Sequence, residues 1–124
     1  MIKIATLNAR SLNSLNKCYY VYDLIKNHQI NVLAIQETHL VDEKKVLEIK
    51  SIFINYYVYL PILNDCSKGI GFIISNEVEI LSFESPNIER LSILSIKFNK
   101  KIMNIANIRC TKSCTSFDLI PLIL

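Results

Sequence analysis

Two short apolar runs on either side of an amphipathic stretch constrain the fold of this chain more than any other feature. Residues 2–7 and 30–35 are apolar enough to form strands that are buried on both faces. Between them, apolar side chains recur at helical spacing over residues 15–27, and Asn13 or Ser14 can cap the start of that helix. A strand, a helix and a strand within so few residues predict a right-handed βαβ unit with parallel strands.

A second helical pattern and five further apolar segments complete the expected fold. Apolar residues set among charged ones over residues 41–50 predict a short helix that returns across the sheet. Segments rich in Ile, Phe, Tyr and Val are expected to form successive antiparallel strands, at residues 53–60, 70–75, 78–83, 91–99 and 101–108. The pattern predicts an α/β fold in which one mixed sheet carries helices on one face, as a single domain over residues 1–124.

Polar residues gather at one edge of this expected sheet. Asn8 and Glu37 follow the two parallel strands, whose carboxyl ends meet at the edge where open α/β sheets bind ligands. Tight turns at residues 76–77 and 99–100 are expected on the opposite edge. Longer connections are expected beside Asn8 and Glu37, at residues 61–68, 84–90 and 109–116. One edge is therefore rich in loops and equipped for chemistry.

Composition and charge limit the classes of protein to which this chain can belong. Hydrophobic residues make up 51% of the sequence, which is enough for a core and argues against disorder. The net charge of +3 permits a polyanionic partner but does not require one. No run is long enough to cross a membrane, and the first residues lead directly into a strand pattern, so we expect neither membrane insertion nor secretion. Four cysteines without paired metal-ligand spacing are expected to be reduced thiols of an intracellular protein: Cys18, Cys66, Cys110 and Cys114.

Three segments resemble a known family in their order and spacing. They are IATLNAR at residues 4–10, LAIQETH at residues 33–39 and KGIGFIIS at residues 68–75. With them the chain resembles the endonuclease/exonuclease/phosphatase superfamily, and more narrowly the endonuclease domain of non-LTR (LINE-type) retrotransposons. The resemblance implies the DNase I-like fold, a four-layer α/β/β/α sandwich of which this chain would be the amino-terminal half.

The resemblance implies a site built on Asn8 and Glu37. Glu37 stands at the position of the family's metal-binding Glu and would hold Mg²⁺ or Mn²⁺, while Asn8 would orient that carboxylate through its amide. The ordinary alternatives stay open, namely a strand-end Glu paired with a lysine and an Asn that makes a turn. Weaker candidates for contacts to DNA phosphates, which solvated surface charge explains equally well, are Arg10, Lys68 and Arg109.

Several catalytic groups of the family are missing from this sequence. There is no G-D-F-N segment and no S-D-H segment, and Arg109 and Thr111 replace the Tyr and Pro of the family's N-[IV]-Y-x-P motif. Because the family's catalytic His belongs near the end of the domain, His39 is expected to be a surface residue beside the site rather than a general base. We therefore expect the amino-terminal fragment of a Mg²⁺-dependent DNA endonuclease that is inactive alone.

Two other functions stay open at this stage. One is a degenerate, non-catalytic remnant that acts as an interaction module, and the other is a fragment of a superfamily phosphatase. A lone sheet would expose a large apolar face, which a homo-oligomer or the missing carboxyl-terminal half would have to cover. The expected partner is DNA and not a membrane, and the expected location is intracellular, in the nucleus if the chain belongs to a retrotransposon protein.

Overall fold

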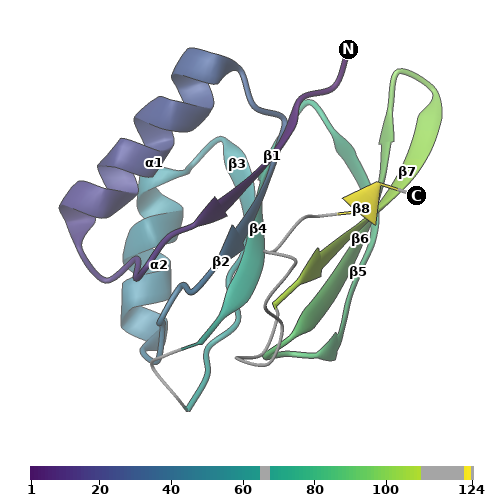
Figure 1. Ribbon diagram of the computed structural model, residues 1–124. Coiled ribbons are helices and arrows are strands. Elements are labelled where there is room, and N and C mark those ends of the chain that lie inside the picture. Colours follow the sequence, from purple (N-terminus) through teal and green to yellow (C-terminus); the bar gives the residue numbers. More distant parts are fainter. Residues whose placement is uncertain (65–67, 110–121, 124) are drawn as a thin grey trace.

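Two helices and two four-stranded sheets make up the computed structural model, which describes residues 1–64, 68–109 and 122–123. Figure 1 shows both helices on one side of the first sheet and the second sheet on its other side. Along the chain the elements are β1 (Ile4–Asn8), α1 (Leu15–His28), β2 (Val32–Gln36), α2 (Glu43–Ile52), β3 (Tyr56–Tyr59), β4 (Ile70–Ser75), β5 (Glu79–Asn87), β6 (Leu91–Phe98), β7 (Lys101–Ile108) and β8 (Leu122–Ile123).

The first sheet confirms the predicted βαβ unit. Its strand order is β1-β2-β4-β3, with β1 parallel to β2 and β4 antiparallel to both of its neighbours. The connecting helix begins where Ser14 accepts a hydrogen bond from Lys17 N, and it ends at Gln29, which adopts a left-handed backbone with φ 54°. The carboxyl ends of β1 and β2 therefore meet at one edge, as the sequence predicts.

The expectation of a single sheet is wrong, because strands β5 to β8 form a second, separate sheet in the order β5-β6-β7-β8. Both edges of β4 are already paired, to β2 and to β3, so no ladder position is left for the next strand. The tight turn at residues 76–77 consequently passes the chain from one sheet to the other. Strand β5 also continues to Asn87, so most of the expected loop at residues 84–90 is strand.

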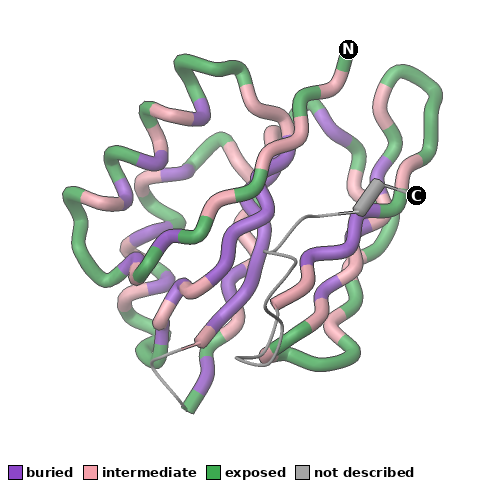
Figure 2. Tube along the Cα trace, in the orientation of Figure 1, coloured by how far each residue is buried: buried purple, intermediate pink, exposed green. Residues whose placement is uncertain are grey.

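Two apolar cores hold these layers together. The helices pack on the first sheet through Cys18, Val21, Leu33 and Ile73, among others, and the two sheets pack through Phe72, Ile74, Leu94, Ile96 and Ile105, among others. Figure 2 shows the resulting burial along β2 and β4, the central strands of the first sheet. The helix-free face of the first sheet is therefore covered by the chain itself, and the expected exposure of that face is wrong.

The α/β class and the placement of helices on one face of a mixed sheet are confirmed. Within the described residues, no helix is long and apolar enough to span a membrane. Cys18 is a free thiol that contacts the carbonyl of Leu12 at 3.3 Å, and burial raises its pKa above the ordinary value. The thiol is thus uncharged and unreactive near neutral pH. The other cysteines, Cys66, Cys110 and Cys114, lie outside the described residues.

Candidate active site

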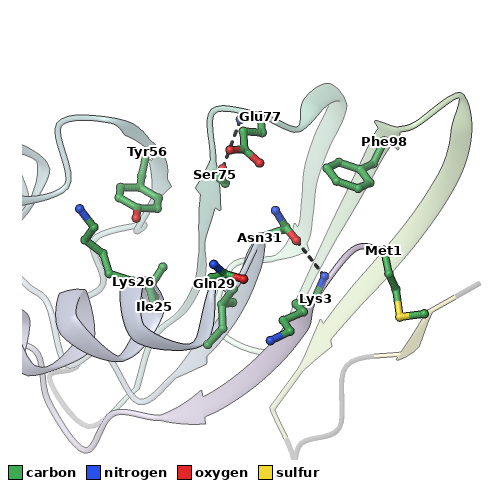
Figure 3. A pocket seen from close by; sticks show the side chains of 11 residues that line it. Met1, Lys3, Ile25, Lys26, Gln29, Asn31, Tyr56, Ser75, Glu77 and Phe98 are labelled. Atoms are coloured by element: carbon green, nitrogen blue, oxygen red, sulfur yellow. Dashed lines mark hydrogen bonds between the residues drawn. The ribbon is translucent and has the colours of Figure 1, made fainter.

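A hollow of about 420 Å³ lies at the edge of the sheets that carries the tight turns. Figure 3 shows that its lining mixes the charges of Lys3, Lys26 and Glu77 with the ring of Tyr56. Part of this polar surface is already paired, because the Asn31 side chain accepts a hydrogen bond of 2.8 Å from Lys3 N. Lys3 and Asn31 directly precede β1 and β2, whose other ends carry Asn8 and Gln36. The hollow therefore lies at the opposite edge from Asn8 and Glu37.

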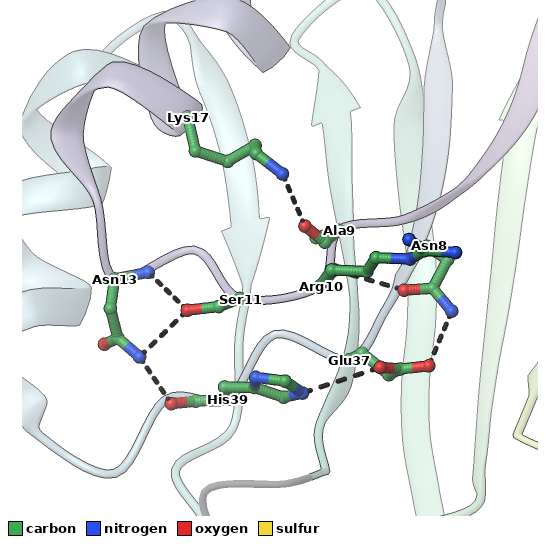
Figure 4. Close-up of polar contacts among 8 residues, drawn as sticks. All are labelled: Asn8, Ala9, Arg10, Ser11, Asn13, Lys17, Glu37 and His39. Atoms are coloured by element: carbon green, nitrogen blue, oxygen red, sulfur yellow. Dashed lines mark hydrogen bonds and ion pairs between the residues drawn. The ribbon is translucent and has the colours of Figure 1, made fainter.

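Asn8 and Glu37 meet at the carboxyl edge of the first sheet. Asn8 is the last residue of β1 and pairs in register with Gln36, so Glu37 follows one residue beyond. The Asn8 Nδ2 donates a hydrogen bond of 2.6 Å to Glu37 Oε2, which Figure 4 shows from close by. A short bond from an amide to a carboxylate fixes the orientation of the carboxylate. The predicted juxtaposition of these two side chains is confirmed.

Backbone hydrogen bonds extend the pairing of β1 and β2 beyond the strands. Ser11 N donates to Glu37 O at 2.8 Å, and Leu12 N donates to Thr38 O at 2.9 Å. On the other side of the same loop, Thr38 N donates to the carbonyl of Gly69 at 3.2 Å. The loop that carries Glu37 is therefore tied to its neighbours on both sides, which holds the carboxylate at a defined place.

Four residues of these two loops have left-handed backbones although none is glycine. Their φ angles are 48°, 90°, 53° and 57° for Arg10, Ser11, Glu37 and His39. Such conformations cost on the order of 1 kcal/mol each and persist only where the surrounding structure enforces them. Their concentration around one carboxylate is typical of sites where geometry matters more than local stability.

His39 lies next to the carboxylate without a hydrogen bond to it. Its Nε2 is 3.6 Å from Glu37 Oε1, which is beyond hydrogen-bond distance, and this nitrogen is buried without another partner. Its backbone is fixed on both sides, because His39 N donates to Lys68 O at 2.8 Å and Asn13 Nδ2 donates to His39 O at 2.9 Å. His39, expected to be a surface residue beside the site, has a partly buried side chain that is 24% exposed.

Glu37 offers a single carboxylate, with one oxygen not bonded to Asn8, to a hard divalent cation. Its side chain is 35% exposed, and the Asn8 amide engages only one of its two oxygens. Mg²⁺ accepts one or two protein carboxylates and completes its shell with water and substrate phosphate. Among the described residues there is no group of three or more His, Cys, Asp or Glu side chains that could hold a metal ion. Glu37 would therefore act as a single carboxylate anchor.

The three basic candidates lie in different surroundings. Arg10 is exposed, and its backbone N donates to Asn8 Oδ1 at 3.1 Å, so it lies beside Asn8. The carbonyl of Lys68 accepts the backbone bond from His39 N, and its ammonium is 3.2 Å from Glu89 Oε2, which partly neutralises it. Arg109 follows β7, and its backbone N donates to Arg90 O at 2.8 Å. The structure thus brings the backbone of Arg10 next to Asn8, places the backbone of Lys68 beside His39, and anchors Arg109 on the second sheet.

Sequence reasoning missed a buried amide pair directly below the site. Gln36 and Asn107 are 1% and 0% exposed, and Gln36 Nε2 donates to Asn107 Oδ1 at 2.9 Å. Gln36 stands in the segment at residues 33–39, and Asn107 begins the N-[IV]-Y-x-P segment in which Arg109 and Thr111 depart from the family, so the signal was present in the sequence. It was missed because a single expected sheet offers no reason for the two to meet.

Comparisons with known proteins identify solved structures with a similar fold. No protein-family model matches the sequence, and no curated protein sequence matches it. Among solved structures, truncated Caenorhabditis elegans TDP2 is similar, with a TM-score of 0.67 at 17% identity over 91% of this chain and 48% of that protein. An AP endonuclease from Archaeoglobus fulgidus is similar with a TM-score of 0.63 at 24% identity, over 87% of this chain and 40% of the other.

The chain has the DNase I-like fold. The catalytic domain of Xenopus laevis APE2 is also similar, with a TM-score of 0.58 at 11% identity over 85% of this chain and 43% of that one. The chain spans less than half the length of each of these three proteins. In this DNase I-like chain, Asn8 and Glu37 stand at the carboxyl ends of strands in the first sheet, where ligands bind to open α/β sheets.

Proposed function

We propose that this chain is the amino-terminal half of a divalent-metal-dependent DNA phosphodiesterase of the retrotransposon endonuclease type. It carries the Asn8 and Glu37 part of the site and has little or no strand-cleaving activity alone. The DNase I-like fold supports the proposal, as does similarity to proteins named as an AP endonuclease and as the catalytic domain of APE2. The retrotransposon type rests on the three sequence segments at residues 4–10, 33–39 and 68–75.

The observation that carries this proposal is the bond between Asn8 Nδ2 and Glu37 Oε2. An ordinary strand-end glutamate would pair with a neighbouring lysine, but Lys68 bonds Glu89 instead. Glu37 is held by the neutral amide of Asn8, and among the described residues no lysine or arginine side chain is paired with it. A carboxylate that is oriented by an amide rather than by a cationic side chain is suited to a metal cation.

Each residue of the site would have a separate role in the chemistry. A bound divalent cation supplies charge stabilisation at phosphoryl oxygens and lowers the pKa of a bound water. Glu37 would hold that cation, and Asn8 would keep the carboxylate in one orientation. Arg10, which is exposed at the same loop, would meet a DNA phosphate. The groups that would activate the nucleophile and protonate the leaving alkoxide are not among the motifs of this sequence, so strand cleavage is not expected.

Metal binding is the first test of the proposal. We expect the chain to bind Mn²⁺ weakly, and Glu37→Gln to lower that affinity by about tenfold or more, because loss of a ligand costs at least as much as loss of its supporting shell. Electron paramagnetic resonance of free Mn²⁺ measures both affinities. Glu43→Gln, which removes an exposed carboxylate on α2, is the matched control and should bind as the parent does. Equal Mn²⁺ affinity in the parent and Glu37→Gln proteins would refute the metal site.

A plasmid-nicking assay tests the second part of the proposal. With Mg²⁺ present, the parent chain should nick supercoiled plasmid no faster than Glu37→Gln or than a sample with EDTA, because most of the catalytic unit is missing. Robust nicking that depends on Glu37 would show that this half contains a complete site. A nuclear location and assembly into oligomers stay predictions from the sequence.

A further inference from the structure

A buried polar link joins the second sheet to the end of β2. Asn107, on β7 of the second sheet, donates through Nδ2 to Ile35 O at 3.1 Å and to Gly71 O at 2.8 Å. Its Oδ1 accepts the bond from Gln36 Nε2 at 2.9 Å, and the same Gln36 nitrogen reaches Thr6 Oγ1 at 2.9 Å. One side chain of the second sheet therefore contacts three residues of the first sheet directly, and β1 through Gln36.

These bonds supply what the apolar contacts between the sheets do not. Burial of Phe72, Leu94 and their neighbours favours close packing, but it is not directional and tolerates a small shift of one sheet along the other. A fully buried amide left without partners costs free energy, so Asn107 and Gln36 are satisfied in one register of the sheets and not in others. The pair fixes how the two sheets sit at this edge.

The buried link through Gln36 lies directly next to the site, because Gln36 and Glu37 are consecutive residues. Glu37 directly follows Gln36 and has a left-handed backbone with φ 53°, which its surroundings must enforce. Gln36 O also accepts the backbone bond of 2.9 Å from Ala9 N, beside Asn8. A change in the position of Gln36 would therefore move Glu37 relative to Asn8, and the bond of 2.6 Å between their side chains would lengthen.

We propose that Asn107 is a positioning residue: through Ile35 and Gln36 it makes the geometry of the Asn8 and Glu37 pair depend on the second sheet. The consequence for a metal bound at Glu37 rests on the proposed function, but the effect on the Asn8 and Glu37 pair does not. Asn107 and Gln36 are both buried, so neither is in a position to contact a substrate. Each acts by fixing the strand from which the carboxylate projects.

The side-chain amide of Asn8 gives a direct readout. Its Nδ2 protons give nitrogen-proton NMR signals that the Asn8→Ser spectrum identifies by their absence, and the bond to the carboxylate shifts one of them away from the position of an exposed asparagine. In Asn107→Ala, we expect these signals to move toward that exposed position while the circular dichroism stays that of a folded protein. Mn²⁺ affinity should fall by about tenfold, as it does when outer partners of a ligand are removed.

Ser92→Ala is the matched control. Ser92 is also 0% exposed and pairs in register with Asn107, but its hydroxyl lies 3.4 Å from that of Ser85 within the second sheet. A variant that merely weakens the second sheet should leave the Asn8 signals and the Mn²⁺ affinity unchanged. If Asn107→Ala also leaves both unchanged, or if Ser92→Ala shifts them equally, the proposal is wrong.

A second variant, and the Asn8 NMR signals recorded without metal, keep the test decisive. Asn107→Ser retains a hydroxyl that can donate to one of the two carbonyls, and it should shift the Asn8 signals less than Asn107→Ala does. An Asn107→Ser protein that does not fold would show that Asn107 serves the fold as a whole, and this too would overturn the proposal. If the parent binds no Mn²⁺, the proposed function fails, but the Asn8 signals still decide whether Asn107 positions Glu37.

Discussion

Gly69→Ala is expected to destabilise the folded chain by about 3 kcal/mol, the sum of backbone strain and overpacking. Gly69 has φ 126°, which side chains rarely adopt, and a Cβ there would lie 2.0 Å from Thr38 Oγ1. The residue cannot move away, because its carbonyl accepts the backbone bond from Thr38 N. Urea unfolding followed by circular dichroism measures the loss.

Thr38→Ala separates the clash from the strain. Thr38 Oγ1 is buried without a hydrogen-bond partner, so its removal should cost only about 1 kcal/mol. In the double variant, the closest atom to the new Cβ is gone while φ at residue 69 stays unfavourable. The double variant should therefore lose about 1 kcal/mol less stability than the sum of the losses in the two single variants. Strict additivity would mean that Gly69 and Thr38 do not contact each other as described.

The loop around Glu37 should respond to the same change. Thr38 follows Glu37 directly, so a displaced Thr38 moves the carboxylate away from Asn8. We expect Gly69→Ala to weaken Mn²⁺ binding in the fraction that remains folded, whereas Thr38→Ala should leave that affinity within about twofold of the parent, because it removes no partner of the carboxylate.

Local patterns were enough to predict the βαβ unit of the first sheet and the pair at its edge. The apolar period in residues 15–27 and the runs on either side dictate a βαβ unit, and the parallel direction of its strands places their two carboxyl ends together. Asn8 and Glu37 follow from that alone, because each stands at the end of one of these strands. The side of the sheet on which each turn lies was equally predictable, since successive antiparallel strands alternate in direction.

The division into two sheets was not predictable from those patterns. A tight turn such as residues 76–77 ordinarily joins partners in one sheet, and nothing local reveals that both edges of β4 are occupied by strands from elsewhere in the chain. The pairing of β4 with β2 joins residues far apart in sequence, and contacts of that kind are not encoded in any short window. Errors about the exposed face and about Asn107 both follow from this one.

Phe72→Ala tests the second sheet directly, with an expected loss of about 3–5 kcal/mol in the free energy of unfolding. Phe72 is 0% exposed, on the face of β4 that meets the second sheet, and its ring packs edge-on against Phe83 with centroids 6.1 Å apart. Removing it leaves a cavity between two sheets that their paired strands prevent from collapsing. Such a loss is a large part of the stability of a small domain, so urea unfolding is best measured at low temperature.

Tyr20→Ala is the control for truncation of an aromatic side chain. Tyr20 is 60% exposed on α1, where alanine is the better helix former, so its loss should change stability by no more than about 0.5 kcal/mol. The contrast between the two variants measures whether the second sheet covers β4. If the helix-free face of the first sheet were open to solvent, Phe72 would resemble Tyr20, and both substitutions would cost little. A large difference instead means that the second sheet buries the face of β4 that carries Phe72, as the shared apolar core of the two sheets indicates.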